Sequence, residues 1–224
     1  MSPDTFTVLH APGHAPDMDA SIIERAESTG ADVIAFSEAY KIAGQELHGR
    51  PDYRVKVGRS NVSTRLVRSP MGDAGDNPIL TATATLERIQ YRRPWRVTHP
   101  GPTKWMKFTP ERWLNVERVQ WGYVTVTVIA AHPSPFFAGP FKWRRVMSAA
   151  IREVHAAKAR GDAVVLVGDL QTRRATALLR EAGLEVFASG IDYLAWSGFK
   201  RFSTQVFRVE PLDHPWILAR FVVA

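Results

Sequence analysis

The order of strand-like and helix-like segments constrains the fold of this chain more than any other feature of the sequence. Apolar runs and period-two alternation predict strands at 6–10, 32–39, 53–58, 63–69, 79–91, 112–120, 123–132, 163–167, 190–196, 203–209 and 216–223. Apolar residues at helical spacing predict helices at 19–29, 141–160 and 173–182. A doubly wound fold would need strand and helix to alternate throughout, whereas here a meander of strands separates the first helix from the second. We therefore predict an α/β fold whose mixed sheets are covered by helices on their outer faces.

Length and composition fit a single domain spanning residues 1–224. The chain is 45% apolar and 10% aromatic, which is enough for a sizeable core. It has no apolar run of about 18 residues or more and no basic, apolar leader, so we predict a cytoplasmic protein with no membrane partner. Cysteine is absent, which excludes zinc–thiolate sites, a cysteine nucleophile and any disulfide-linked partner. We expect a monomer.

The charge of the chain points toward a polyanionic partner. The formal net charge is +7 at pH 7, and a positive surface attracts nucleic acid through long-range attraction and counterion release. A loop-rich insertion at about 92–112 is rich in proline and places basic residues among tryptophans. Its candidate nucleic-acid-binding residues are Arg92, Arg93, Arg96, Lys104, Trp105 and Lys107. The alternative is that these tryptophans only hold the loop against the core. Further candidates for phosphate contacts are Arg144, Arg145, Arg173 and Arg174.

Acids and histidines stand where several apolar strands end. They are Glu38, His132, Asp169, Asp192, Asp213 and His214. A single acid at such a place is usually a turn residue, but five separate segments deliver such groups, and sites tend to be assembled at strand ends. Carboxylates without thiols form an oxygen-rich set suited to Mg²⁺ or Mn²⁺. Histidines paired with carboxylates can orient a water for attack on a phosphate.

Five segments together resemble, in order, the sequence blocks of the endonuclease/exonuclease/phosphatase superfamily, the metal-dependent hydrolases that include deoxyribonuclease-I-like nucleases. The segments are DVIAFSE, VTVTVIAAHPSP, VVLVGDLQT, GIDYLAW and LDHPWILARF. The resemblance covers nearly the whole chain. It implies a four-layer α/β sandwich, in which two mixed β-sheets pack face to face and are flanked by helices.

The resemblance also implies a role for each polar residue at a strand end. Glu38 would be the metal-binding glutamate, Asp213 would lie near the metal, and His132 would contact the phosphate. Asp169 would polarise or orient the attacking water.

The same resemblance implies a general base. His214 would take the proton from the attacking water, and Asp192 would be its partner. The implied cofactor is Mg²⁺ or Mn²⁺, and the implied reaction is hydrolysis of a phosphoester.

The chain departs from the superfamily pattern at three places. The first strand normally ends in an asparagine, and Pro12 stands there instead, with His10 and His14 close by. Gln171 replaces a second asparagine and keeps its amide on a side chain that is one methylene longer. Leu212 replaces a serine. The glutamate, both histidines and the three aspartates are all present in spite of these departures. The sequence therefore favours an active but divergent enzyme.

The sequence therefore predicts a divalent-metal-dependent phosphodiester hydrolase, with DNA as the preferred nucleic acid. One alternative is a phosphomonoesterase or lipid-headgroup phosphodiesterase of the same fold. The other is a catalytically inactive protein that binds nucleic acid.

Overall fold

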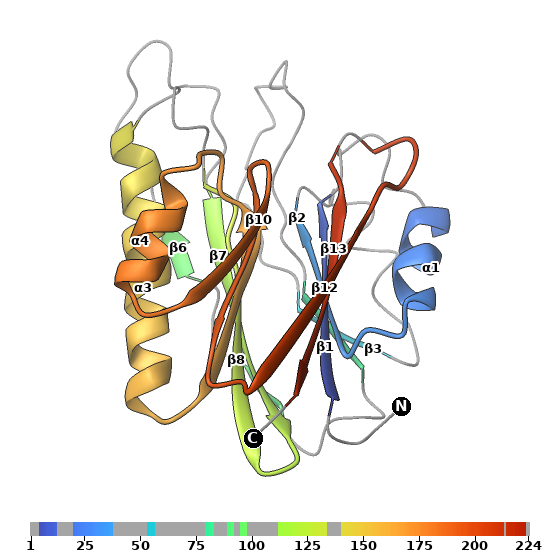
Figure 1. The fold of residues 1–224 in the computed structure, drawn as a ribbon, viewed down its shortest axis with the longest axis horizontal. Coiled ribbons are helices and arrows are strands. Elements are labelled where there is room, and N and C mark those ends of the chain that lie inside the picture. Colours follow the sequence, from blue (N-terminus) through green and yellow to red (C-terminus); the bar gives the residue numbers. More distant parts are fainter. Residues whose placement is uncertain are drawn as a thin grey trace.

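The computed structural model places two β-sheets face to face between layers of helix (Figure 1). It describes residues 5–12, 20–37, 53–56, 79–82, 89–91, 95–97, 112–133, 140–212 and 214–222. Among these residues, no helix has both the length and the apolar character needed to cross a membrane.

The first sheet is built from both ends of the chain. Its order is β12-β13-β1-β2-β4-β3, with bounds Arg201–Phe207, Trp216–Val222, Thr5–Pro12, Val33–Ser37, Ile79–Ala82 and Tyr53–Lys56. The strand β1 lies parallel to β2 and antiparallel to β13. Every residue of β2 is buried, because this strand is covered on both faces.

The second sheet comes from the later part of the chain. Its order is β10-β11-β9-β8-β7-β5, with bounds Glu185–Ser189, Asp192–Ser197, Ala163–Asp169, Val124–Ala130, Arg112–Trp121 and Ile89–Tyr91. The short strand β6, Trp95–Val97, pairs with the beginning of β7. The strand β9 is parallel to β8 and antiparallel to β11, so this sheet is mixed as well.

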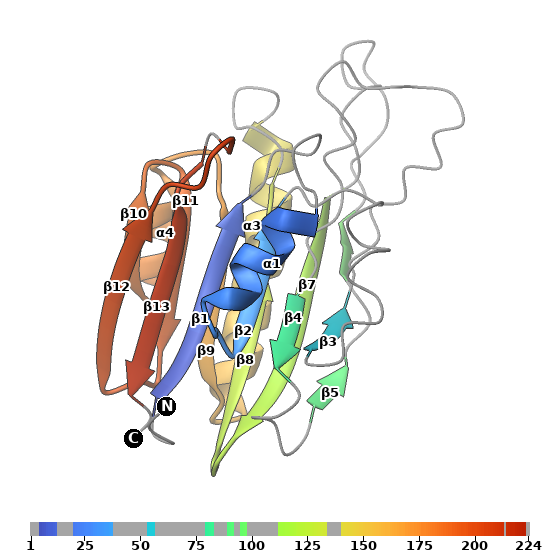
Figure 2. The same cartoon turned by 90° about the vertical axis from the view of Figure 1, so that its right-hand side faces the viewer.

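In the part of the chain that the structure describes, three helices lie on the outer faces of the sheets and complete four layers (Figures 1 and 2). The helix α1, Ala20–Ser28, covers the first sheet, and α3, Pro140–Ala159, and α4, Ala175–Glu181, cover the second. One apolar cluster lies under α1, a second lies under α3 and α4, and a third fills the space between the sheets. The predicted sandwich of two mixed sheets flanked by helices is confirmed.

Three local predictions need correction. Residues 79–91 read as one alternating strand, but their two ends belong to different sheets, because β4 pairs with β2 and β5 pairs with β7. The insertion at 92–112, predicted as loop, contains β6. The strand β10 was not predicted, since it is short and none of its residues is buried. Residues 63–69, predicted as a strand, lie outside the described part.

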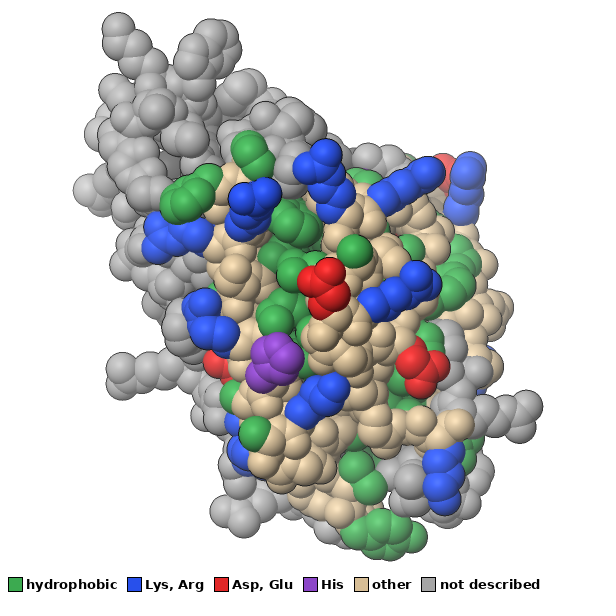
Figure 3. All heavy atoms as spheres, turned by 60° about the vertical axis from the view of Figure 1, so that its left-hand side comes forward, with side chains coloured by type: hydrophobic (Ala, Val, Ile, Leu, Met, Phe, Trp, Pro, Cys, Tyr) green, Lys and Arg blue, Asp and Glu red, His purple; other side chains and the backbone are tan. Residues whose placement is uncertain are grey.

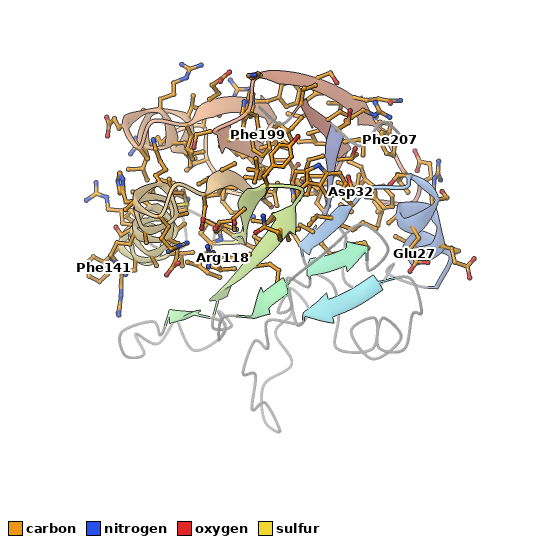
Figure 4. The ribbon with its side chains drawn as sticks, turned by 90° about the horizontal axis from the view of Figure 1, so that it is seen from below. Glu27, Asp32, Arg118, Phe141, Phe199 and Phe207 are labelled. Carbon is orange, nitrogen blue, oxygen red and sulfur yellow. The ribbon has the colours of Figure 1, made fainter. Side chains whose placement is uncertain are left out.

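Aromatic rings fill the space between the sheets at the end near the two termini, which Figure 4 shows from below. Phe199 stacks on Phe221 with ring centroids 4.4 Å apart, and on Phe6 with centroids 6.2 Å apart. At the same end, buried Asp162 accepts two hydrogen bonds of 3.0 Å from the Arg118 guanidinium. Aromatic packing and a buried carboxylate with its hydrogen bonds made therefore stabilise this end of the molecule. We assign these residues a structural role.

A second buried carboxylate at this end makes the stability pH-dependent. Asp32, which precedes β2 and is labelled in Figure 4, accepts a 2.7 Å hydrogen bond from the Thr7 amide. Burial raises the pKa of Asp32 to about 6, against the lowering effect of that hydrogen bond. Because this folded-state pKa lies above the unfolded value of 3.8, the group contributes stability at low pH that is lost as the pH rises through about 6.

We expect Asp32→Asn to stabilise the protein above pH 6, because the amide oxygen still accepts from Thr7 and no charge is buried. The free energy of unfolding in urea should rise by about 1 to 3 kcal/mol near pH 8 and by much less near pH 4. Glu24→Gln on the exposed face of α1 removes the same charge and serves as the control. An equal gain at both pH values would contradict the burial of a charged Asp32.

Candidate active site

Several strand ends with chemically useful residues meet at the end of the sandwich opposite the termini (Figure 1). The strands β1 and β2 are parallel and end there together. The strands β8 and β9 are also parallel and end there too. The strands β11 and β13 run antiparallel to β9 and β1, so they begin at that end. Residues that end one strand and residues that begin another are thereby brought to one place.

Two acids of the site come from neighbouring strands of the second sheet. Asp169 ends β9 and Asp192 begins β11, and the two residues are directly paired across the ladder. Both are buried. One ligand atom each from Asp169, Asp192 and His214 lie within 4.8 Å of one another. This spacing fits three groups that share one small site.

Asp192 contacts two histidines, one in β1 of the other sheet and one in the bend before β13. The His214 Nδ1 atom lies 2.8 Å from Asp192 Oδ2, and the His10 Nε2 atom lies 3.3 Å from Asp192 Oδ1. A carboxylate only accepts hydrogen bonds, so each imidazole donates an N–H to it. The carboxylate therefore holds a histidine on each oxygen.

Those hydrogen bonds determine the charge of Asp192. Burial acts to raise the pKa of this carboxyl, but the hydrogen bonds from His10 and His214 outweigh burial and lower the pKa below its usual value of 3.8. Asp192 is thus ionised at neutral pH. An ionised Asp192 keeps the proton of His214 on Nδ1 and leaves Nε2 as the nitrogen that can take up a proton.

Gln171 joins the second acid to a histidine. Its backbone N–H donates to Asp169 Oδ1 at 2.9 Å, and its side-chain amide donates to Asp169 Oδ2. The same amide nitrogen lies 3.3 Å from His132 Nε2, and the distance from His132 Nε2 to Asp169 Oδ2 is 3.8 Å. The amide NH₂ carries two hydrogens, so one reaches the carboxylate and the other the imidazole. The longer side chain therefore still connects both partners.

The loop that carries Gln171 is fixed at several points. Gln171 itself has φ +62°, a left-handed conformation that a non-glycine residue adopts at a cost. The Leu170 carbonyl accepts a 2.7 Å hydrogen bond from the Trp143 indole of α3, and the Thr172 carbonyl accepts one of 3.0 Å from Tyr193. These bonds hold the loop against both α3 and β11.

A close backbone contact places His132 beside Asp169. The Ala131 amide donates to the Val167 carbonyl at 2.9 Å, just beyond the last paired residues of β8 and β9. A Cβ atom on Gly168 would lie 1.7 Å from the Ala131 carbonyl oxygen. Only glycine fits there, so Gly168 lets the histidine and the carboxylate approach each other.

The structure brings together five of the residues that the sequence singled out for this site: His132, Asp169, Gln171, Asp192 and His214. Glu38 and Asp213 lie outside the described residues, although β2 ends at the residue before Glu38. Arg92, Arg93, Lys104, Trp105, Lys107 and His14 also lie outside them. Of Arg96, only the backbone is described, in β6 opposite Trp113.

The site contains one residue to which the sequence assigned no role. His10 was noted only as a neighbour of the departure at Pro12, yet it contacts Asp192 directly. Alternation along β1 places His10 on the same face as Phe6 and Val8, which was the available signal. Pro12 is the last residue of β1, and its carbonyl accepts a 3.2 Å hydrogen bond from the Trp216 indole.

No protein-family model matches the sequence, and no curated protein matches it either. Solved structures do match the fold. A D. rerio TDP2 complexed with a single-strand DNA product is 12% identical, covers 97% of this chain and 98% of that chain, and gives a TM-score of 0.67. An endonuclease/exonuclease/phosphatase family protein from Bacteroides thetaiotaomicron is 13% identical over 98% of each chain, with a TM-score of 0.63. This chain has the endonuclease/exonuclease/phosphatase fold.

A mannosyl-6-phosphatase of Bacteroides thetaiotaomicron shares this fold too, with 13% identity, a TM-score of 0.67, and coverage of 97% of this chain and 99% of that chain. The resemblance seen in the sequence is thus confirmed at the level of the fold. At these identities the likeness speaks for the fold alone, so the chemistry of this endonuclease/exonuclease/phosphatase fold depends on the residues at the site.

Proposed function

We propose that this chain is a divergent member of the endonuclease/exonuclease/phosphatase superfamily that hydrolyses phosphodiesters of nucleic acid, with DNA preferred, in a reaction that needs a divalent metal ion. The observation that carries this proposal is the pair of groups at one end of the sandwich. One is Asp192 with His214, and the other is Asp169 with Gln171 and His132. The first is suited to activate water, and the second to contact phosphate.

The proposed base is His214. With Nδ1–H donated to Asp192, its Nε2 takes the proton from a water molecule as the water oxygen attacks phosphorus. The P–O bond to the leaving group then breaks, and that oxygen leaves with the electron pair. Asp192 holds the imidazole in the required tautomer and stabilises the imidazolium that forms. Asp169 orients the attacking water.

Gln171 and His132 are the proposed phosphate contacts. Both sit beside Asp169, on a loop and a strand end that the backbone contact at Gly168 holds together. In the structure the Gln171 amide donates to Asp169 and to His132, so binding of a phosphoryl oxygen would exchange the Gln171–His132 hydrogen bond for one to the phosphate. The N–H released by that exchange would donate to the oxygen as negative charge grows on it.

A divalent ion is proposed to bind next to Asp169, Asp192 and His214, which keep the roles given above. The ligand atoms of Asp169, Asp192 and His214 lie within 4.8 Å of one another, and carboxylate oxygens are preferred by Mg²⁺ and Mn²⁺. Glu38 and Asp213 are the proposed ligands. When bound, the ion neutralises charge on the phosphoryl group.

The outer face of the second sheet, which reaches from the site to the opposite end of the molecule, favours a polyanion as substrate. Basic side chains gather on the face that α3 and α4 form (Figure 3). Of the side chains that the structure describes within 140–185, the exposed basic ones are Arg144, Arg152, Lys158, Arg160, Arg173, Arg174 and Arg180, and the exposed acids are Glu181 and Glu185. Arg173 and Arg174 directly follow the anchored loop of Gln171, so they are held close to the phosphate contacts. One of the solved structures of this fold carries a single-strand DNA product, which agrees with such a substrate.

A substrate panel tests the proposal. Purified protein is incubated with single-stranded DNA, supercoiled plasmid, RNA and a sugar phosphomonoester, each with Mg²⁺, Mn²⁺ or EDTA. We expect cleavage of DNA with metal and none with EDTA. Cleavage of the sugar phosphate alone would replace the proposal with a phosphomonoesterase, a reaction named for another protein of this fold. DNA binding in EDTA without cleavage under any metal would identify an inactive binding protein.

Arg173 and Arg174 give a sharper prediction about the substrate. We expect the double change Arg173→Ala/Arg174→Ala to weaken single-stranded DNA binding and to reduce the slope of log Kd against log salt by about 1 to 2. The matched control is Arg152→Ala/Arg180→Ala, which removes the same charge from α3 and α4 farther from the loop. Equal effects of the two pairs would show that only net charge matters, and an unchanged slope would place the DNA on another face.

A further inference from the structure

His10 is buried between the two sheets, at the end of the molecule opposite the termini. It is 0% exposed and stands in β1 between Ile217 of β13 and Ala35 of β2. Phe6 and Val8 share its face and pack in the cluster that joins the sheets. A histidine at such a position interrupts an otherwise apolar surface, so its polar atoms need a reason to be there.

One ring nitrogen of His10 has a hydrogen-bond partner, and the other has none among the described residues. The Nε2 atom bonds Asp192 Oδ1 at 3.3 Å, whereas the Nδ1 atom is buried and has no hydrogen-bond partner in the described part of the chain. A buried orphan N–H costs more than a buried lone pair. The arrangement therefore favours the neutral imidazole that carries its proton on Nε2 and donates it to Asp192.

This donation fixes a carboxylate that would otherwise have one oxygen unsatisfied. His214 occupies Oδ2 at 2.8 Å and His10 occupies Oδ1, so the plane of the carboxylate is held from both sides. Without His10, the Asp192 carboxylate would be free to turn away from His214, and Nδ1–H would lose its acceptor. The contact joins residues 182 positions apart and crosses from one sheet to the other.

We propose that His10 is a positioning residue, which holds Asp192 in the orientation that keeps the His214 proton on Nδ1. His10 itself touches no reacting atom. The base would then be the last member of a relay of three side chains, His10–Asp192–His214. The expected effect of His10 on kcat rests on the proposed function. Its expected effect on the tautomer of His214 does not.

The experiment compares two substitutions of similar bulk. His10→Gln retains a side-chain N–H donor that can reach Asp192, and His10→Leu fills the space without a donor. We expect His10→Leu to lower kcat by about 10- to 100-fold with KM and the Mg²⁺ requirement unchanged. His10→Gln should restore most of the rate. Val8→Ala, on the same face of β1, weakens packing alone and should leave kcat of the folded protein unchanged.

A second readout needs neither metal nor turnover. Long-range ¹H–¹⁵N spectra of the metal-free protein report which nitrogen of each histidine carries the proton. We expect His214 to be protonated on Nδ1 in wild type and in His10→Gln, and to be a mixture of tautomers in His10→Leu. If wild type cleaves no phosphoester, the proposed function fails while this spectrum still decides the role of His10.

Three results would overturn the inference. The first is an unchanged His214 tautomer in His10→Leu. The second is a loss of kcat in Val8→Ala as large as in His10→Leu, which would reduce His10 to packing. The third is a rate of His10→Leu that high Mg²⁺ restores, because Asp192 would then serve the metal ion and not His214.

Discussion

His214→Ala is expected to lower kcat for phosphodiester hydrolysis by about 10²- to 10⁴-fold, the range that general-base catalysis supplies. The imidazole is held by Asp192 at 2.8 Å and remains partly exposed, with 25% of its side chain accessible, so water can reach it. KM should change little, because the proposed role of His214 is to act on the attacking water. Initial rates on a labelled single-stranded oligonucleotide at saturating Mg²⁺ provide the measurement.

The control for this substitution is His155→Ala, which removes an exposed histidine of α3 at no cost to the site. Metal titration separates the base from the proposed ligands. Glu38→Ala should recover part of its activity in excess Mg²⁺ or Mn²⁺, while His214→Ala should not. A His214→Ala protein with wild-type kcat would show that another group takes the proton.

Among alanine substitutions at the described glycines, Gly168→Ala should lower the stability of the protein most. Its Cβ would stand 1.7 Å from the carbonyl oxygen of Ala131, a backbone atom that no side-chain rotation can move. The ends of β8 and β9 must separate to relieve the overlap, and the hydrogen bond from Ala131 to Val167 lengthens with them. We expect the free energy of unfolding to fall by about 3 kcal/mol or more.

Urea unfolding measures this loss, and Gly122→Ala is the matched control. Gly122 also has a positive φ, of +54°, but a Cβ there meets nothing within 4 Å, so its cost should be only about 1 kcal/mol. The folded fraction of Gly168→Ala should also lose activity, since Asp169 and His132 move apart. Equal losses in the two variants would mean that β8 and β9 do not approach as closely as described.

The sequence predicted the architecture because the apolar pattern determines which strands are buried. The apolar run of β9, which is entirely buried, predicted a strand that ends at Asp169. Apolar residues at helical spacing predicted the helix α3. Parallel neighbours and antiparallel returns then bring strand ends together whatever the loops do. Local chemistry was therefore enough to nominate His132, Asp169, Asp192 and His214.

Other features depend on contacts that no local pattern encodes. Alternation along residues 79–91 is the same whichever sheet a strand joins, so the division between β4 and β5 was not visible. The partnership of His10 with Asp192 arises only when two sheets pack face to face. The left-handed backbone of Gln171 also has no sequence signal, because glycine or asparagine is the usual residue at such a φ.

The position of a bound divalent ion tests the proposed centre most directly. Crystals of the protein soaked with Mn²⁺ reveal the ion by its anomalous scattering, independently of any assay. We expect one strong peak beside the group formed by Asp169, Asp192 and His214, and its loss in Glu38→Ala at the same Mn²⁺ concentration. A peak at a different place, or the absence of any peak from a protein that cleaves DNA in EDTA, would contradict the metal-dependent mechanism.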